Sequence, residues 1–271
     1  MERKTEYQNA NPDLQTIRES ERRYFDDKAG KDIEGLDTDD LLVDPAAYRP
    51  TLKLWGFENG LHGKKVLECG CGTGFFSVLL AKVGAEVSCF DLSPKSIEMT
   101  MNRATLNGVE DRVRAKVTAF EDLAYEDESF DLVVGKNILH HIPDIAAAGT
   151  QIRRVLKQGG RAIFYELNAS NPVLMFFRRH VIGRARLIPK LGTPDEHPLT
   201  ADEVETLSAI FDNKCTVSYP KFRFFGKFDR QILQQRYRPI SLLLEGIDRM
   251  IYVCFPPLRK YSYKILLEFE K

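Results

Sequence analysis

Cysteine patterns that form disulfides or bind zinc are missing from this sequence of 271 residues. There are five cysteines, an odd number, and no two of them are spaced as C-x-x-C. A disulfide framework and a structural zinc site are therefore not predicted, and we expect no metal centre. Free cysteines in this number are typical of a reducing compartment, which predicts a cytoplasmic protein.

Long apolar runs are also missing. The first residues, Met1–Glu6, carry charges instead of the apolar core of a signal peptide. No window approaches the ~20 uncharged apolar residues of a membrane-spanning helix. There is no low-complexity run and no repeat of fixed period, so neither a solenoid nor a long disordered tail is predicted. We expect a soluble globular protein.

Net charge is zero, which argues against a nucleic-acid-binding protein. The charge is nevertheless divided unevenly along the chain. Residues 1–171 contain six more acidic than basic residues, and residues 172–271 contain six more basic than acidic ones. No nucleic-acid partner is expected, because the basic residues of the second half do not form a known recognition motif.

Three alternating glycines in Glu68-Cys69-Gly70-Cys71-Gly72-Thr73-Gly74 are the most informative feature that is present. An apolar run precedes them and a helix-forming run, 75–83, follows, so they are predicted to form a strand-to-helix turn. Glycine permits a close backbone approach to a ligand. A dinucleotide fingerprint is disfavoured, because Phe75 stands where its third glycine would fall.

The acid-x-G-x-G-x-G order resembles motif I of the class I S-adenosylmethionine-dependent methyltransferases. Asp91, 17 positions after Gly74, stands at the end of the next predicted strand, where an acid can bind a ribose diol. Leu92 follows it and offers an apolar face to adenine. The cofactor implied is S-adenosyl-L-methionine, with S-adenosyl-L-homocysteine as the product.

Three later segments resemble the ubiquinone and menaquinone biosynthesis (type 11) group of these enzymes: Thr118–Leu123, Ser129–Asp144 and Leu156–Ala162. In the first, Ala119 replaces the aspartate that usually accepts from the adenine amino group, and Phe120 can offer its backbone N–H and a stacking surface. The cofactor-binding residues implied by the resemblance are Glu68, Gly70, Cys71, Gly72, Gly74, Asp91, Leu92, Ala119, Phe120 and Asn137.

The resemblance and the alternation of strands and helices predict an α/β, Rossmann-like fold with a seven-stranded, mostly parallel sheet and an antiparallel last strand. Five strands are expected at 66–69, 86–90, 113–117, 130–135 and 160–165, a sixth at 215–224 and the last at 263–269. Residues 1–60 are predicted to be a helical lid, 61–171 the cofactor-binding core, and 172–271 the completion of the sheet with a helical cap insertion. Tyr24, in the lid, is expected to close over the methionine end of the cofactor.

Two adjacent histidines, His140 and His141, follow the fourth predicted strand. A neutral histidine is the usual base for a hydroxyl or acidic carbon near pH 7. We predict that His140 is the base or a substrate contact and that His141 orients the loop by a hydrogen bond. Glu166 and Asn168, at the end of the fifth strand, are candidates for substrate binding or for loop hydrogen bonds.

Two segments of the basic second half are rich in large apolar residues. Residues 172–190 combine them with five basic residues and no acid, which suits either a wall of a lipophilic pocket or a peripheral contact with a membrane. Residues 240–260 are expected to form a cap helix that buries its apolar face.

The function predicted is methyl transfer to oxygen or carbon of a small lipophilic acceptor, such as a lipid, a quinone-like molecule or a natural product. Two alternatives stay open. The fold could use its bound cofactor for a cyclisation or rearrangement without methylation, or it could bind S-adenosylmethionine without catalysis. The sequence identifies neither the acceptor nor the oligomeric state.

Overall fold

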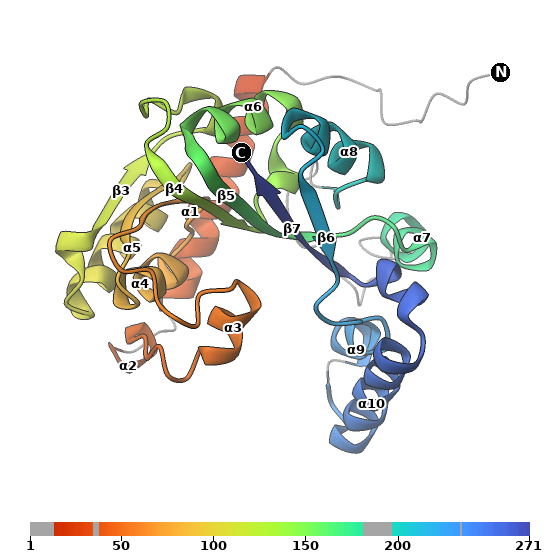
Figure 1. Ribbon diagram of the computed structural model, residues 1–271. Coiled ribbons are helices and arrows are strands. Elements are labelled where there is room, and N and C mark those ends of the chain that lie inside the picture. Colours follow the sequence, from red (N-terminus) through yellow and green to blue (C-terminus); the bar gives the residue numbers. More distant parts are fainter. Residues whose placement is uncertain (1–13, 35–37, 181–196, 234) are drawn as a thin grey trace.

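A single seven-stranded sheet organises the protein in the computed structural model, which describes residues 14–34, 38–180, 197–233 and 235–271. The strands are β1 (Lys65–Cys69), β2 (Glu86–Asp91), β3 (Val113–Val117), β4 (Phe130–Lys136), β5 (Leu156–Leu167), β6 (Cys215–Ser218) and β7 (Lys264–Glu270). Their order is β3-β2-β1-β4-β5-β7-β6, and β7 runs antiparallel to both of its neighbours (Figure 1). The predicted fold class, including the antiparallel last strand, is confirmed.

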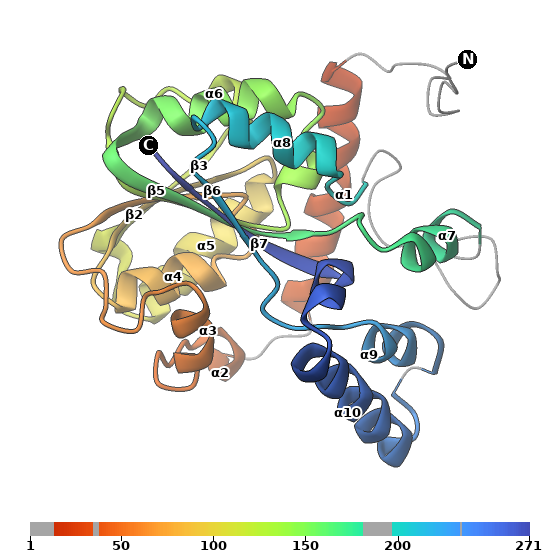
Figure 2. The ribbon, with the colours of Figure 1, turned by 45° about the vertical axis from the view of Figure 1, so that its right-hand side comes forward.

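Helices cover both faces of the sheet (Figures 1 and 2). They are α1 (Leu14–Glu34), α2 (Thr38–Leu41), α3 (Arg49–Leu54), α4 (Phe75–Lys82), α5 (Pro94–Leu106), α6 (Ile145–Val155), α7 (Pro172–His180), α8 (Ala201–Ile210), α9 (Phe225–Phe228) and α10 (Arg238–Cys254). Short turns of helix are η1 (Glu110–Arg112), η2 (Phe120–Asp122), η3 (Leu139–His141), η4 (Asp229–Leu233) and η5 (Pro256–Tyr261).

Helix starts follow their local capping signals. Ser93 accepts a hydrogen bond from the Ser96 N–H and begins α5, with Pro94 at the first position. Thr200 and Glu203 form a reciprocal capping box at the start of α8. Both caps are local features, because each depends on residues only three positions apart.

The described part of residues 1–60 divides into two regions. Helix α1 lies along the edge where the parallel strands end, and its Asp26 accepts a 2.5 Å hydrogen bond from the Ser93 hydroxyl at the start of α5. Leu52, Trp55 and Phe57, in contrast, are buried and pack against α4 as part of the core. Within the described part of residues 1–60, α1 thus lies at the edge of the sheet and Leu52, Trp55 and Phe57 belong to the core, so the lid stays a prediction; residues 1–13 and 35–37 lie outside the described part.

The prediction that residues 240–260 bury their apolar face is wrong. The buried residues of α10 are Ser241 and Asp248, both polar, whereas Leu243 is 64% exposed. In both views α9 and α10 project away from the sheet (Figures 1 and 2). The reason is tertiary: Asp248 binds the backbone at the start of α9, so the side of α10 that carries Asp248 and the half-buried Leu244 and Ile251 faces inward, and Leu242, Leu243, Met250 and Val253 are left outward. Within the described residues, no helix has the length and apolarity to cross a membrane.

Candidate active site

The glycine loop between β1 and α4 has the left-handed backbone that its sequence predicts. Gly70, Gly72 and Gly74 have φ of 68°, 52° and 77°. A Cβ on Gly70 would lie 2.7 Å from the Ile138 side chain, and one on Gly74 would lie 2.6 Å from the Thr100 Cα. A Cβ on Gly72 would meet nothing within 4 Å. Gly70 and Gly74 are thus required for packing, and open space lies beside the Gly72 Cα, where a side chain would otherwise point.

Polar side chains on the buried face of α5 bind backbone carbonyl groups of the glycine loop. The Thr100 hydroxyl donates to the Gly72 carbonyl at 3.1 Å, and the Arg103 Nε donates to the Thr73 carbonyl at 3.0 Å. Arg103 is 4% exposed, and burial lowers its pKa from the ordinary value. Neither Thr100 nor Arg103 is among the site residues that the sequence predicts. Their spacing with Ser96, at i, i+4 and i+7, places three polar groups on one buried face, and that pattern is the signal that could have revealed them.

Two acids lie next to the loop at different depths. Asp91 accepts from the Gly72 N–H at 2.9 Å through Oδ2 and from the Ser93 N–H at 3.0 Å through Oδ1, so it is joined to the glycine loop. Burial raises its pKa above the ordinary aspartate value. Glu68 is 3% exposed and accepts from the Ser77 hydroxyl, and burial raises its pKa well above the ordinary value. Glu68 therefore lies beneath the loop and supports it.

The region predicted for adenine is formed by three residues at the ends of β2 and β3. Leu92 is half-buried at the end of β2, and Ala119 precedes η2 without a polar side chain. The Phe120 ring is 4% exposed and packs edge-on against Phe90, with centroids 5.1 Å apart. Because its ring is in the core, any contact of Phe120 with a nucleoside must come from its backbone. Cys71, also predicted for the cofactor, is buried beside Thr100.

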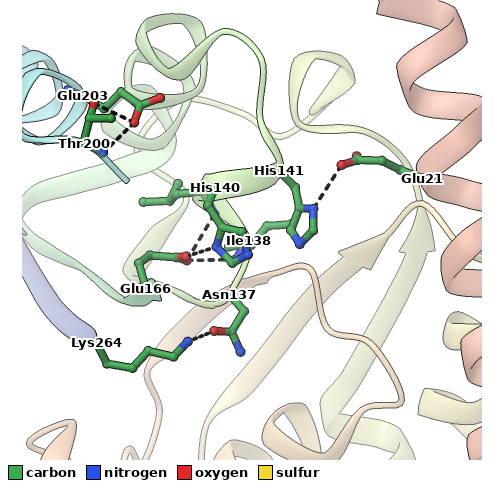
Figure 3. A network of polar contacts seen from close by, with 10 residues as sticks. Glu21, Asn137, Ile138, His140, His141, Glu166, Thr200, Glu203 and Lys264 are labelled. Carbon is green, nitrogen blue, oxygen red and sulfur yellow. Dashed lines mark hydrogen bonds and ion pairs between the residues drawn. The ribbon is translucent and has the colours of Figure 1, made fainter. Parts of the chain in front are cut away.

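A buried carboxylate organises the segment after β4. Glu166 is fully buried, and its Oε1 accepts from the N–H groups of Ile138 and Leu139 at 2.8 and 3.1 Å. Its Oε2 lies 2.6 Å from Nδ1 of His140, which is 3% exposed (Figure 3). A carboxylate at that distance favours a proton on Nδ1, which makes Nε2 the basic atom of the neutral ring. Glu166 thus positions His140 in one tautomer.

His141 connects this segment to α1. Its Nδ1 lies 3.1 Å from Oε1 of the buried Glu21, and its ring meets Phe25 edge-on at 5.3 Å (Figure 3). The rings of His140 and His141 are 4.4 Å apart. Tyr24 is half-buried on α1 and packs edge-on against Phe25 at 5.2 Å. The predicted lid residue and the two histidines are therefore joined through one aromatic cluster.

Asn137 directly follows β4 and contacts the last strand, β7. It has a φ of 57°, and its Oδ1 accepts from Nζ of Lys264 on β7 (Figure 3). The Lys264 ammonium also lies 5.3 Å from the centre of the Tyr165 ring. Asn168, by contrast, donates to the carbonyls of Lys260 and Ser262, so it serves a loop and not the site. Within the described residues, no group of His, Cys, Asp and Glu could hold a metal ion.

The fold and the location of these residues define a class of protein: a Rossmann-like domain of the methyltransferase type, with its site at the carboxyl ends of β1, β2 and β4. The structure of geranyl diphosphate C-methyltransferase from Streptomyces coelicolor A3(2) is similar, with a TM-score of 0.59 and 16% identity. That similarity covers 96% of this chain and 99% of the other. The [4+2]-cyclase SpnF also matches, with a TM-score of 0.50, 18% identity and coverage of 81% and 80%. Similarities at these identities show the fold alone.

Sequence comparisons point to the same class of protein. Residues 67–164 match the family described as a methyltransferase domain. Over 136 residues the chain is 37% identical to a ubiquinone biosynthesis O-methyltransferase from Xanthomonas oryzae pv. oryzae, covering 48% of this chain and 54% of that protein. Residues 67–164 are therefore similar to a methyltransferase domain of the kind found in the ubiquinone-type group. The chain spans about half the length of the curated relatives that it matches.

Proposed function

We propose that this protein is an S-adenosylmethionine-dependent methyltransferase that acts on oxygen or carbon of a small lipophilic acceptor. The observation that carries the proposal is the glycine loop. Open space lies beside the Gly72 Cα, and the Gly72 N–H donates to the Asp91 carboxylate at 2.9 Å, which joins the loop to the acid. The methyltransferase-domain match at residues 67–164 supports this assignment. The O-methyltransferase relative favours oxygen as the accepting atom.

The residues of the loop fit the proposed cofactor. A carboxylate has about four acceptor sites, and the two backbone N–H groups at Asp91 leave acceptor capacity for a ribose diol. Gly70, Gly72 and Gly74 would hold the amino-acid end, Leu92 and the backbone of Phe120 would face adenine, and Tyr24 and Asn137 would contact the methionine side. S-adenosylmethionine, when bound, supplies a sulfonium that releases its methyl group by in-line displacement.

The chain's own contribution would be to orient the acceptor, exclude water and take one proton. His140 is the proposed base, acting at Nε2, because the Glu166 carboxylate 2.6 Å from Nδ1 fixes the tautomer and stabilises the charged ring that forms. His141 would position the segment through Glu21 and α1.

The two alternative functions are less well supported. The cyclase shares the fold without showing that this chain shares its reaction. A buried histidine held by a buried carboxylate favours a catalytic role over cofactor binding alone. Release of S-adenosylhomocysteine upon addition of an acceptor, measured with a catechol as the probe, distinguishes methyl transfer from both alternatives.

Gly72→Ala tests the proposal, and Gly108→Ala is its matched control. Both glycines have positive φ, 52° and 64°, and an added Cβ meets nothing within 4 Å at either position. Each substitution should therefore cost about 1 kcal/mol of stability from the left-handed backbone. Gly108 lies after α5, away from the loop.

Calorimetry with S-adenosylmethionine and S-adenosylhomocysteine should show tight binding to the wild type and to Gly108→Ala. Binding to Gly72→Ala should weaken about tenfold or more, because the methyl group occupies the space that the ligand needs. Equal affinity in both variants, or no heat with the folded wild type, would contradict the proposed site.

A further inference from the structure

Helix α10 exposes an apolar face that neither the proposed site nor the core uses. Leu242, Leu243, Met250 and Val253 are 59%, 64%, 52% and 62% exposed. Residues 243, 246, 250 and 253 recur at i, i+3, i+7 and i+10, so they line one side of the helix, and Gly246 between them has no side chain. We call Leu242, Leu243, Met250 and Val253 the α10 outer face.

The opposite side of α10 shows that this orientation is built into the fold. Asp248, 4% exposed, accepts from the N–H groups of Phe224, Phe225 and Gly226 at 2.8 to 3.2 Å. Those N–H groups start α9 and would otherwise lack acceptors within the helix. Rotating α10 to bury its apolar side would expose Asp248 and break these bonds. The apolar side therefore stays outward.

The charges around the outer face are almost all positive. Residues 219–263 contain nine Lys and Arg and three acids, and two of the acids, Asp229 and Asp248, are buried. Glu245 is the exposed acid of this region. The exposed basic residues near α10 are Arg236 and Arg238 at its start, Arg249 within it, and Lys260 after it.

We propose that the α10 outer face docks on an anionic lipid surface. Exposed Leu, Met and Val side chains beside arginine and lysine are the combination that inserts an amphipathic helix at the boundary of negatively charged lipid. A second copy of this chain is a poorer occupant, because a two-fold pairing of this face would bring the same basic residues together. The proposal does not depend on the proposed methyl transfer.

The surface is distinct from the segment 172–190, for which the sequence analysis left a membrane contact open. Residues 181–190 lie outside the described part of the chain. Helix α7, the described part, meets α9 through Phe177 and Phe228, whose ring centroids are 6.5 Å apart. Phe176 on α7 is 57% exposed and is followed by Arg178 and Arg179. Helices α7, α9 and α10 thus form one neighbouring group of elements that is basic and apolar.

Flotation of the purified full chain with vesicles tests the docking. The protein should float with phosphatidylcholine vesicles that contain phosphatidylglycerol and stay behind with phosphatidylcholine alone. Leu243→Gln/Met250→Gln should reduce the bound fraction roughly tenfold, since two large apolar side chains no longer enter the lipid. Arg249→Gln should reduce the bound fraction about fivefold, and only at low salt.

Leu42→Gln/Leu106→Gln is the matched control. These leucines are 50% and 45% exposed outside the α9–α10 region, so the control removes similar apolar area from another surface and should float like the wild type. Thermal melts of all variants check folding, and Arg249→Gln keeps the test decisive if the double variant melts early. Failure of the wild type to float with anionic vesicles, or undiminished flotation of both α10 variants, overturns the proposal. A wild-type dimer in light scattering that becomes monomeric in Leu243→Gln/Met250→Gln also overturns it, in favour of a second copy.

Discussion

Two buried carboxylates in different regions of this protein each accept hydrogen bonds from backbone N–H groups at the start of a short helix, with different consequences. In the methyltransferase core, Glu166 accepts from the N–H groups of Ile138 and Leu139 and from the His140 ring at the start of η3. In the α9–α10 region, Asp248 accepts from three N–H groups at the start of α9. The first acid presents a titratable ring at the edge of the sheet, and the second fixes the orientation of a helix.

The comparison shows that an amphipathic pattern does not by itself determine which side of a helix is buried. Helix α4 buries Phe76, Leu79 and Leu80 against the sheet, as its apolar sequence predicts. Helix α10 instead leaves four large apolar side chains exposed, because the side that packs inward is the one that carries Asp248, whose carboxylate binds the start of α9. An unpaired buried donor costs about 1–3 kcal/mol, which is comparable to the gain from burying one apolar side chain.

The largest effect is expected from Glu166→Gln, which tests the core side of the comparison. A glutamine oxygen can still accept from the Ile138 and Leu139 N–H groups, but its NH2 group would donate to Nδ1 of His140 and place the ring proton on Nε2. His140 would then no longer have a free lone pair at Nε2 to accept a proton, while the backbone of Ile138 and Leu139 would keep its hydrogen bonds to residue 166. Turnover should fall ~10²–10⁴-fold, with cofactor affinity from calorimetry unchanged.

His140→Ala provides the comparison for Glu166→Gln. If the two residues act as a unit, this variant should lose turnover to a similar extent, and the double variant should lose little more. Wild-type turnover in either single variant, with acceptor and cofactor saturating, would remove the histidine from the mechanism.

A pair of leucine substitutions is expected to show the next largest effect and sharpens the contrast between the two regions. Leu80 in α4 is fully buried, so Leu80→Ala should lower the free energy of unfolding by about 2–5 kcal/mol. Leu243 in α10 is 64% exposed, so Leu243→Ala should change it by no more than about 0.5 kcal/mol. Urea unfolding without lipid measures both. Similar losses would mean that the outer face is packed in solution, contrary to the structure.

The smallest expected effect concerns pH and the acid beneath the glycine loop. Burial raises the pKa of Glu68 well above its ordinary value, so the folded protein holds this proton more tightly than the unfolded chain. The resulting stability is present in full below the unfolded pKa and is lost as pH rises through the folded pKa. Glu68→Gln, which still accepts from the Ser77 hydroxyl through its amide oxygen, should remove this loss of stability at high pH.

Thermal melts at about pH 5 and about pH 8 measure the difference between Glu68→Gln and the wild type. The variant should gain relative to the wild type at the higher pH. Glu86→Gln, which neutralises an exposed acid on the neighbouring strand, is the control for a general effect of charge. A Glu68→Gln difference that does not change with pH would contradict the shifted pKa.

The parts of the site that could be predicted are those in which the signal is local. The glycine loop, the caps at Ser93 and Thr200 and the position of Asp91 each follow from residues a few positions apart or from the end of a strand. The contribution of Arg103 could not be predicted in the same way, because it reaches the Thr73 carbonyl from thirty positions along the chain. The burial of the Phe120 ring depends likewise on Phe90 on the adjacent strand.

The sequence by itself determined the order of strands and helices and the left-handed glycine turn, because backbone conformation and alternation of apolar runs are properties of neighbouring residues. Tertiary structure alone decided that Glu166 selects a tautomer of His140, that α1 meets His141 through Glu21, and that α10 faces outward. Each of these depends on which distant partner satisfies a buried polar group. The local sequence shows that a buried polar group needs a partner, but it does not show which distant residue provides that partner.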